Sequence, residues 1–309
     1  MSLMSDWAAR GAAGLLVLTC QATLAAPAHA GQADTDALKE ESRSPLFPGA
    51  RHLRLARQGS RPLVVHVVEL DLERAPVRWR LSPGDRTAGM EYVAETVKEA
   101  AIRHHALVAI NASYFLPFAG GSAGADDFYP HGGDPVSASG AVLTAGRVIS
   151  PPEYDLDIRI NAMACFKGAT GRIVKGQKCP SGYKDGVAAG PLLLAGGHRE
   201  PLAPFDNNYA ITDQPRSAIG FSGDGRKAWM VAVDGRQAGS VGISLSDLTE
   251  VFIRLGASDA INLDGGGSTT LVASGSDGAA RVLNTPIHSA VPGRERPVAN
   301  TLLLVLADR

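Results

Sequence analysis

The sequence predicts an α+β fold, a single domain with a mixed β-sheet core and a few flanking helices. Short apolar or alternating runs typical of strands recur along most of the chain, and few segments carry helical periodicity. A length of 309 residues is ample for one hydrophobic core. The 45% hydrophobic and 20% charged residues exclude wholesale disorder. Because 30 Lys and Arg balance 31 Asp and Glu, the charge also argues against a nucleic-acid partner.

The N-terminal segment has the pattern of an export signal. Residues Gly11–Ala26 form an apolar run too short to span a bilayer comfortably, and Ala28-His29-Ala30 matches a signal-peptidase site. We therefore predict a signal peptide over residues 1–30 and a periplasmic or extracellular protein. No other apolar run is long enough for a span, so we expect no stable membrane insertion after signal cleavage. Residues 31–60 are polar and charged and are predicted to be a linker, which leaves 61–309 as the folded domain.

The first part of that domain is predicted to be rich in strands. Leu63–Leu70 and Val77–Leu81 alternate or run apolar in the manner of half-buried strands. Glu91–His104 places five apolar residues on one face of a helix. Leu107–Asn111 is a short buried strand that ends in a polar residue. These elements supply the first half of the expected α+β pattern.

The middle of the chain is harder to assign to elements. Ala119–Gly140 is dense in Gly and Asp and has no secondary-structure period, which predicts a long loop of functional importance. Only Cys165 and Cys179 remain after signal cleavage, and an even pair in an oxidising compartment predicts a disulfide. Two unrelated thiols are the alternative. Neither cysteine has the spacing of a zinc site.

The C-terminal part is more regular. Ser217–Phe221 and Ala228–Val233 flank an Asp-Gly turn and predict a β-hairpin. A helix with a serine cap follows and ends at Gly256, the residue type that best adopts the left-handed conformation. Ala260–Leu263 and Val298–Leu306 are the last predicted strands, the second of them buried.

The most informative run begins where one of these strands ends. Asp264 is followed by Gly265, Gly266 and Gly267. Glycines let the backbone approach a ligand closely, and consecutive N–H groups can converge on an anion. The run is not a P-loop, because no Lys follows at the required spacing. A plain glycine turn between strands is the alternative interpretation, which three costly glycines disfavour.

Other polar residues stand at the ends of predicted strands. Arg216 enters one strand, where its planar guanidinium suits bidentate contact with phosphate or carboxylate, although a surface ion pair is the common use of a single Arg. Asp234 follows the second hairpin strand, where an Asp-Gly pair often makes only a turn. Asn111 and Tyr114 follow an earlier buried strand. Each signal is weak alone.

Together these motifs resemble the phosphodiester glycosidase family. The order and spacing agree from Leu107 to Leu306, and the Asn-Leu-Asp-Gly-Gly-Gly-Ser run is the most specific match. Ser217 stands where the family usually has Thr, and the first motif reads Asn-Ala-Ser where glycines are common. The matching segments are Asn111–Phe115, Pro215–Gly220, Asp234–Arg236, Ser240–Gly242, Leu255–Ala257, Asn262–Ser268 and Arg296–Asn300.

The resemblance implies an exported hydrolase that cleaves the sugar C1–O–phosphate bond of a glycosyl-1-phosphodiester, with residues 61–309 as its catalytic domain. Its partner is a glycan or sugar-phosphodiester substrate. Glycoside hydrolysis generally uses two carboxylates, and a phosphate leaving group makes charge stabilisation the larger need. The catalytic candidates are Asp264, Asp234 and Arg216. The substrate-binding candidates are Asn111, Tyr114, Ser217, Asn262, Gly265, Gly266, Gly267, Ser268, Thr269 and Arg296.

Two other functions compete with this one. A non-catalytic exported module could bind anionic polysaccharide with the same Arg and glycine loop. A serine hydrolase could use Ser268, although the chain lacks a GxSxG motif. We expect neither cofactor nor metal, with a calcium site at Asp126, Asp127 and Asp264 as the minor alternative.

Overall fold

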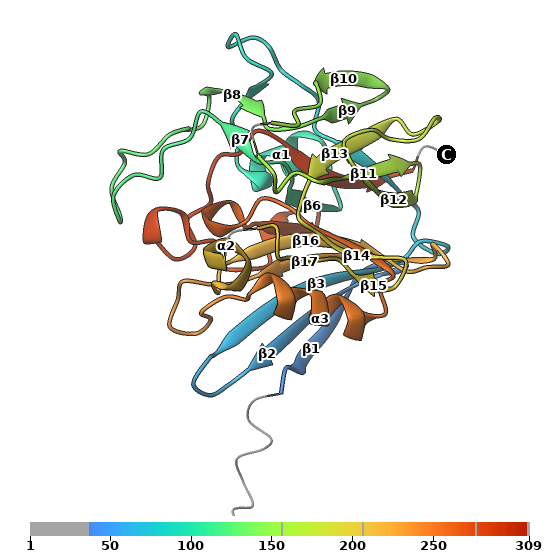
Figure 1. The fold of residues 1–309 in the computed structure, drawn as a ribbon, viewed down its shortest axis with the longest axis vertical. Helices are drawn as coiled ribbons and strands as arrows, with labels where there is room; N and C mark the ends of the chain where they lie inside the picture. Colours follow the sequence, from blue (N-terminus) through green and yellow to red (C-terminus); the bar gives the residue numbers. More distant parts are fainter. Residues whose placement is uncertain (1–36, 156, 206, 276, 308–309) are drawn as a thin grey trace, which may run out of the picture. The chain divides into compact units, whose positions relative to one another are not determined.

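An eight-stranded antiparallel sheet forms the central layer of the fold (Figure 1). The computed structural model describes residues 37–155, 157–205, 207–275 and 277–307. In spatial order the strands of this sheet are β1 (Lys39–Phe47), β2 (Ala50–Arg57), β3 (Leu63–Asp71), β17 (Lys227–Val233), β16 (Arg216–Phe221), β18 (Asp259–Asn262), β14 (Leu192–Ala195) and β15 (His198–Arg199).

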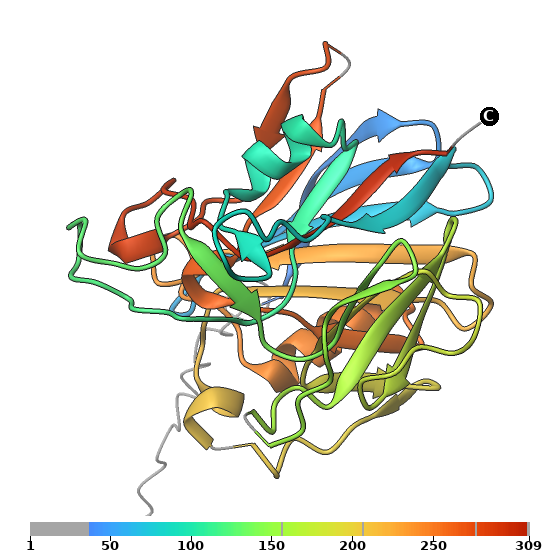
Figure 2. The same ribbon diagram turned by 90° about the horizontal axis from the view of Figure 1, so that it is seen from above.

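Three smaller sheets complete the strand content. The final strand β21 lies between β6 and β4, which Figure 2 shows in red between teal and cyan. One sheet has the order β20 (Ala280–Val282), β19 (Leu271–Ser274), β6 (Val108–Asn111), β21 (Thr301–Leu306) and β4 (Val77–Leu81). A second has β10 (Arg147–Ser150), β9 (Val142–Thr144), β13 (Asp185–Ala189), β11 (Ala162–Lys167) and β12 (Thr170–Lys175), and a third has β5 (Tyr92–Val93), β8 (Pro135–Ala138) and β7 (Phe115–Leu116).

The helices are few and begin and end where local sequence signals place them. In α1 (Val97–Arg103), Thr96 and Glu99 form a capping box. The longest helix, α3 (Leu245–Leu255), is capped by Ser244 and ends at Gly256, whose φ of 87° is left-handed. A short helix, α2 (Asn207–Ile211), and two 3₁₀ turns, Gly266–Ser268 and His288–Ala290, complete the set.

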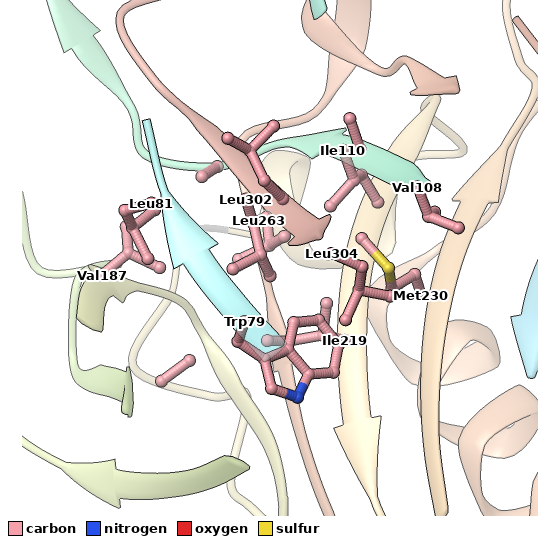
Figure 3. Packing of buried hydrophobic residues seen from close by; sticks show 14 of the residues in the cluster. Trp79, Leu81, Val108, Ile110, Val187, Ile219, Met230, Leu263, Leu302 and Leu304 are labelled. Carbon is pink, nitrogen blue, oxygen red and sulfur yellow. The ribbon is translucent and has the colours of Figure 1, made fainter. Parts of the chain in front are cut away.

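The central sheet buries both of its faces. On one face, residues such as Val67 and Val231 pack against Leu248 and Phe252 of α3. On the other face the central sheet contacts the two five-stranded sheets. Figure 3 shows this second interface, where Ile219, Met230 and Leu263 meet Trp79, Leu81, Val108, Ile110, Val187, Leu302 and Leu304. The described residues therefore belong to one tightly connected unit.

The structure confirms the α+β prediction in outline and corrects some of its parts. All the strand pairs named above are antiparallel, so the expected mixed sheet is wrong. Residues 39–57 of the expected linker form β1 and β2. The seven N-terminal residues of β1 are exposed, so this edge strand carries little of the apolar pattern that marks a strand. The signal peptide predicted over residues 1–30 lies outside the described residues.

Two element boundaries also differ from expectation. The predicted helix Glu91–His104 is shorter, because Tyr92 and Val93 pair with the strand β8 and Thr96 starts the helix. The predicted loop Ala119–Gly140 contains β8 near its end. No helix within the described residues is long and apolar enough to cross a membrane.

The predicted disulfide is present. Cys165 on β11 is bonded to Cys179, which follows β12, with the two Cα atoms 5.6 Å apart. Cys165 belongs to a small apolar cluster with Met163 and Ile160, and this cluster includes Tyr114. The disulfide therefore crosslinks the sheet of β11 and β12, and this sheet packs against Tyr114, a residue of the site described below.

Candidate functional site

Three strands of the central sheet bring the key side chains to one edge. Arg216 is the first residue of β16 and pairs with Val233, the last residue of the antiparallel β17. Arg236 follows three residues later. Asp264 comes two residues after β18, which is also antiparallel to β16. Antiparallel pairing places the start of β16 beside the ends of its two neighbours, so residues far apart in sequence meet at this edge.

These residues line a cavity of about 1020 Å³. Further walls come from the segment after β6, from the Gly-rich part of residues 119–140 and from the 3₁₀ turn at His288–Ala290. The charged residues that line the cavity are Arg159, Arg216, Arg236, Arg296, Asp157 and Asp264. Cationic groups thus outnumber anionic groups by four to two.

Three of the four arginines are held by neutral acceptors. Arg216 donates to the carbonyl oxygens of Tyr209, Thr212 and Ile243, and Arg236 donates from Nε to Gln214 Oε1 over 2.8 Å. Within the described part of the chain, neither these two nor Arg296 forms a salt bridge with a carboxylate. Burial lowers the pKa of all three guanidiniums. Such a cluster favours an anionic ligand.

Arg296 is fixed on three sides. Its Nε donates to His288 Nδ1 over 3.1 Å, its Nη1 donates to Ser268 Oγ over 3.1 Å, and its guanidinium carbon lies 4.6 Å from the centre of the Phe118 ring. Burial and the nearby arginines lower the pKa of His288 to about 4, so its ring stays neutral at pH 7 and can accept this bond. Both hydrogen-bond acceptors of Arg296 are therefore neutral.

Asp264 is the carboxylate at the floor of this arrangement. Burial raises its pKa, while a hydrogen bond from the Ser268 side chain and the charge of Arg296 act in the opposite direction. Its backbone is also fixed, because Asp264 N donates to Ala112 O and Asn111 Nδ2 donates to Asp264 O over 2.6 Å. A carboxylate with a raised pKa in a cavity is a candidate for proton transfer.

The three glycines after Asp264 have close neighbours on the side where a Cβ atom would lie. A Cβ atom on Gly265 would lie 2.8 Å from the carbonyl oxygen of Pro215, one on Gly266 would lie 3.2 Å from Arg236 Nη2, and one on Gly267 would lie 2.5 Å from Arg296 Nη2. The N–H of Gly266 already donates to Pro215 O. The run thus packs two arginines against bare backbone, and the Gly266 N–H is engaged within the protein.

An aromatic wall forms another part of the cavity lining. Tyr114 Oη donates to Gly190 O over 2.8 Å and lies 2.6 Å from Tyr209 Oη. Burial raises the pKa of Tyr114 well above its usual value, so this phenol stays protonated. The guanidinium of Arg159 covers both rings, at 4.6 Å and 4.9 Å, and Asp157 binds that guanidinium through both of its oxygens.

Several predicted substrate-binding residues lie behind the cavity wall. Asn111 Oδ1 accepts from Ser217 Oγ and from Thr270 N, and Asn262 Nδ2 donates to the carbonyl oxygens of Gly190 and Leu263. These buried side chains satisfy loop backbone groups. The predicted residues that do not line the cavity are Asn111, Ser217, Asn262, Ser268, Thr269 and Asp234, whereas Tyr114, Arg216, Asp264, Gly265, Gly266, Gly267 and Arg296 do.

Asp234 has structural partners. Its Oδ1 accepts from Thr285 N over 2.7 Å, and its Oδ2 lies 3.5 Å from His66 Nε2. Asp234 is 5% exposed and does not line the cavity, whereas Arg236, two residues later, does. The Asp-Gly-Arg motif therefore contributes its arginine to the cavity, although the sequence argument selected its acid.

The sequence argument also missed the aromatic wall's partners. Arg159 and Asp157 lie in a stretch without periodicity, and Tyr209 lies on a five-residue helix that was not predicted. Phe118, which also lines the cavity, directly precedes the predicted loop Ala119–Gly140 and belongs to none of the predicted motifs. Among the described residues, no group of three or more His, Cys, Asp or Glu side chains is arranged to hold a metal ion, and Asp127 instead accepts from the Ser122 backbone and hydroxyl.

The fold has relatives among solved structures. The zebrafish N-acetylglucosamine-1-phosphodiester alpha-N-acetylglucosaminidase catalytic domain, auto-inhibited by its pro-peptide, matches with a TM-score of 0.59 and 20% identity over 89% of this chain and 87% of that one. A Synechocystis protein matches with a TM-score of 0.56 and 18% identity, over 83% of this chain and 62% of that one. The Burkholderia pseudomallei protein named "Putative exported protein" matches with a TM-score of 0.52 and 18% identity, over 79% of this chain and 74% of that one. At these low sequence identities, the structural matches show likeness of fold alone.

Sequence comparison identifies the family. The prophage-derived protein YomE of Bacillus subtilis (strain 168) is 35% identical over 94 residues, which cover 30% of this chain and 13% of that protein. The chain thus spans a small part of that relative. The sequence profile of the phosphodiester glycosidase family matches residues 104–305, the region that holds the cavity's arginines and Asp264. The chain belongs to the phosphodiester glycosidase family.

Proposed function

We propose that this protein hydrolyses the bond between the anomeric carbon of a sugar and a phosphodiester oxygen, in a glycan outside the cytoplasm. The observation that carries the proposal is the convergence of Arg216, Arg236 and Arg296 on the cavity that also holds Asp264. The three guanidiniums supply an excess of positive charge that a phosphodiester anion would balance. Family membership supports the same chemistry.

In the reaction we propose, water attacks the anomeric carbon and the bond from that carbon to the phosphate oxygen breaks. The departing phosphomonoester keeps the bonding electrons, and the arginines stabilise the charge that develops on it. Asp264 takes the proton from the attacking water. A pKa raised by burial makes this carboxylate a stronger base, which suits the role.

This scheme uses one carboxylate in the cavity, where glycosidases commonly use two. The other carboxylate there, Asp157, is bound through both oxygens to Arg159. A phosphate is a good leaving group, so a second carboxylate that would protonate it is not required. Assignment of the reaction to Asp264 alone replaces the pair of Asp264 and Asp234 that the sequence suggested.

An oxidising compartment outside the cytoplasm is part of the proposal. Disulfides such as Cys165–Cys179 persist where thiols are not kept reduced. One of the solved structures with the same fold carries the name "Putative exported protein". The predicted signal peptide agrees with this location.

The test is release of reducing sugar and phosphomonoester from the methyl diester of a sugar 1-phosphate. We expect turnover by the wild type and a loss of at least ~10²-fold in Asp264→Asn, the usual size of a general-base contribution. Asp224→Asn, in an exposed hairpin turn, is the matched control and should keep wild-type rates. Binding of phosphodiesters without any hydrolysis would instead favour the non-catalytic module that binds anionic polysaccharide.

A further inference from the structure

Two arginines of the cavity are held by side chains that also have a second polar end. Arg236 donates to Gln214, and Arg296 donates to His288. An arginine side chain offers only donors, so each partner must turn an acceptor atom toward it. The opposite end of a carboxamide or of a neutral imidazole is then a donor. The two arginines thus fix the direction of two further N–H donors.

The amide nitrogen of Gln214 is the first of these donors. Gln214 Oε1 accepts from Arg236 Nε over 2.8 Å, and this bond distinguishes the oxygen of the carboxamide from its nitrogen. Among the described residues, Gln214 Nε2 has no hydrogen-bond acceptor. Gln214 lines the cavity. Its amide N–H groups are therefore available to a ligand there.

The ring of His288 is the second donor, and it acts on a neighbouring hydroxyl. The pKa of His288 is lowered to about 4 and Nδ1 accepts from Arg296, so the neutral ring carries its proton on Nε2. Nε2 lies 3.5 Å from Ser289 Oγ, and its N–H faces a lone pair of the hydroxyl and directs the hydroxyl proton away. In the part of the chain that the structure describes, Ser289 Oγ has no other hydrogen-bond partner. Ser289 also lines the cavity, so its O–H is available to a ligand.

The backbone holds Ser289 in an unfavourable conformation at this position. Ser289 has φ 49° and Ala290 has φ 58°, which is the left-handed region that side chains with a Cβ atom seldom adopt. Gly124 N donates to Ser289 O over 2.7 Å, and Val291 N donates to His288 O over 3.0 Å. Strained residues that their surroundings hold in place are concentrated at ligand-binding sites.

The arginines that accompany the two donors approach adjacent glycines. A Cβ atom on Gly266 would lie 3.2 Å from Arg236 Nη2, and one on Gly267 would lie 2.5 Å from Arg296 Nη2. A single anion in the cavity can therefore face both guanidiniums and the donor beside each of them.

We propose that Gln214 and Ser289 are further recognition residues, which donate hydrogen bonds to the non-bridging oxygens of the phosphodiester. This inference rests on the proposed function. The non-bridging oxygens of a phosphodiester anion only accept hydrogen bonds, so they match a wall on which every free polar end is a donor. The arginines supply the charge, and the two neutral donors supply direction.

The test for Ser289 is the binding of dimethyl phosphate, which has the two non-bridging oxygens and no sugar. Titration is followed by phosphorus NMR. In Ser289→Ala we expect the Kd to rise about tenfold, the usual effect of losing one hydrogen bond to a charged group. Alanine already adopts the left-handed conformation at position 290, so the variant should fold, and a melting curve checks this. Ser60→Ala, at an exposed turn between β2 and β3, is the matched control and should keep the wild-type Kd.

The test for Gln214 must separate its own hydrogen bond from its hold on Arg236. Gln214→Ala is therefore made in an Arg236→Ala background, and dimethyl phosphate is again the probe. We expect the double variant to bind about tenfold more weakly than Arg236→Ala alone. Equal Kd values for these two proteins would show that Gln214 only holds Arg236, and would overturn its assignment as a donor.

An unchanged Kd in Ser289→Ala would overturn the assignment of Ser289. Absence of dimethyl phosphate binding to the wild type would overturn both assignments. Hydrolysis of the methyl diester of a sugar 1-phosphate is measured in parallel. If hydrolysis is absent and the expected Kd changes are present, the proposed reaction alone is refuted. If hydrolysis is present and the Kd values do not change, the two donors alone are refuted.

Discussion

Arg296 donates a hydrogen bond from Nη1 to Ser268 Oγ over 3.1 Å, and the Ser268 side chain is in turn hydrogen-bonded to the carboxylate of Asp264. A neutral hydroxyl thus connects the cation and the anion of the site. Ser268 is fully buried, and its role there is to link two charged groups. The alternative of a serine nucleophile needs a hydroxyl exposed to the cavity, and Ser268 does not line it.

Replacement of Arg296 by Lys should reduce catalysis although it keeps the charge. A lysine cannot bond His288 and Ser268 at once in a fixed plane and also stack on Phe118. We expect kcat/KM to fall by about 10²-fold, the usual effect of losing one oriented donor. Arg281→Lys, on an exposed strand, is the control. An Arg296→Lys enzyme with wild-type kcat/KM would show that only the charge matters.

Addition of a single methyl group at Gly267 should have a similar effect. The Cβ would lie 2.5 Å from Arg296 Nη2, so the guanidinium must shift. Gly267 has no positive φ, so backbone strain adds nothing to the result. We expect Gly267→Ala to lower kcat/KM by about tenfold or more, since misplacement by about 1 Å can cost 10²-fold. Gly239→Ala, where a Cβ meets nothing within 4 Å, should leave the steady-state kinetics unchanged; equal behaviour of the two variants would contradict the role given to Gly267.

Asp234→Asn distinguishes a structural acid from a catalytic one. The carboxylate holds Thr285 N and faces His66, outside the cavity. The variant should lose about 1 kcal/mol of unfolding free energy, near the value of one buried hydrogen bond. Its kcat should stay within about threefold of wild type, because uninvolved groups change catalysis little. Thermal denaturation measures the predicted loss of stability, and steady-state kinetics measures the predicted kcat. A folded variant that loses activity about 10²-fold would restore Asp234 to the catalytic role that the sequence suggested.

The sequence was a good guide to the regular elements that carry the site. The hairpin of β16 and β17, helix α3 with its end at Gly256, and the strand before Asp264 all follow from periodicity and turn residues. The reason is local: the helix has a one-sided apolar pattern, and the strands are short, largely apolar runs. The position of Asp264 at a strand end, beside a glycine run, could therefore be predicted.

The direction of the polar side chains could not be predicted. Asn111 and Asn262 stand at strand ends, as ligand-binding residues often do, yet both turn inward to bond loop backbone groups. Which way such a side chain points depends on unsatisfied carbonyl and N–H groups that only the assembled loops create. Arg159 and Tyr209 escaped notice for a related reason. Their loops have no periodicity, and their importance arises from stacking across 50 residues of sequence.

Loss of the disulfide should lower stability more than activity. Cys165 and Cys179 are 14 residues apart, and chain entropy predicts a contribution of about 3 kcal/mol for a loop of this size. We expect the Cys165→Ser, Cys179→Ser double variant to denature at a temperature lower by roughly 6–12 °C, at 2–4 °C per kcal/mol for a domain of this size. Its kcat at 25 °C should remain near wild type, because neither cysteine lines the cavity. If the double variant, the reduced wild type and the oxidised wild type all denatured at the same temperature, the prediction would be contradicted.

Because the pKa of Asp264 is raised, we expect its charged form, which the reaction needs, to make the folded protein less stable than its protonated form does. Because the folded protein raises this pKa above the unfolded value, the folded state binds the proton more tightly. The proton therefore adds stability at low pH, and that contribution is lost as the pH rises through the folded pKa. Above it, the buried negative charge reduces stability. Asp264→Asn removes that charge and should raise Tm at pH 7 by roughly 2–4 °C, the response to about 1 kcal/mol.

The gain should shrink as the pH falls toward about 4, the usual range of an Asp carboxyl, because wild type is then protonated as well. Calorimetric melting curves of the two proteins between pH 4 and pH 8 measure this difference. Asp259→Asn is a control, since that residue is half-buried and lies outside the cavity. A gain that is constant across the range would show that packing causes it and that the charge of Asp264 does not. A gain that grows with pH, in a variant that has lost turnover, would identify Asp264 as a group kept at the expense of stability for its chemistry.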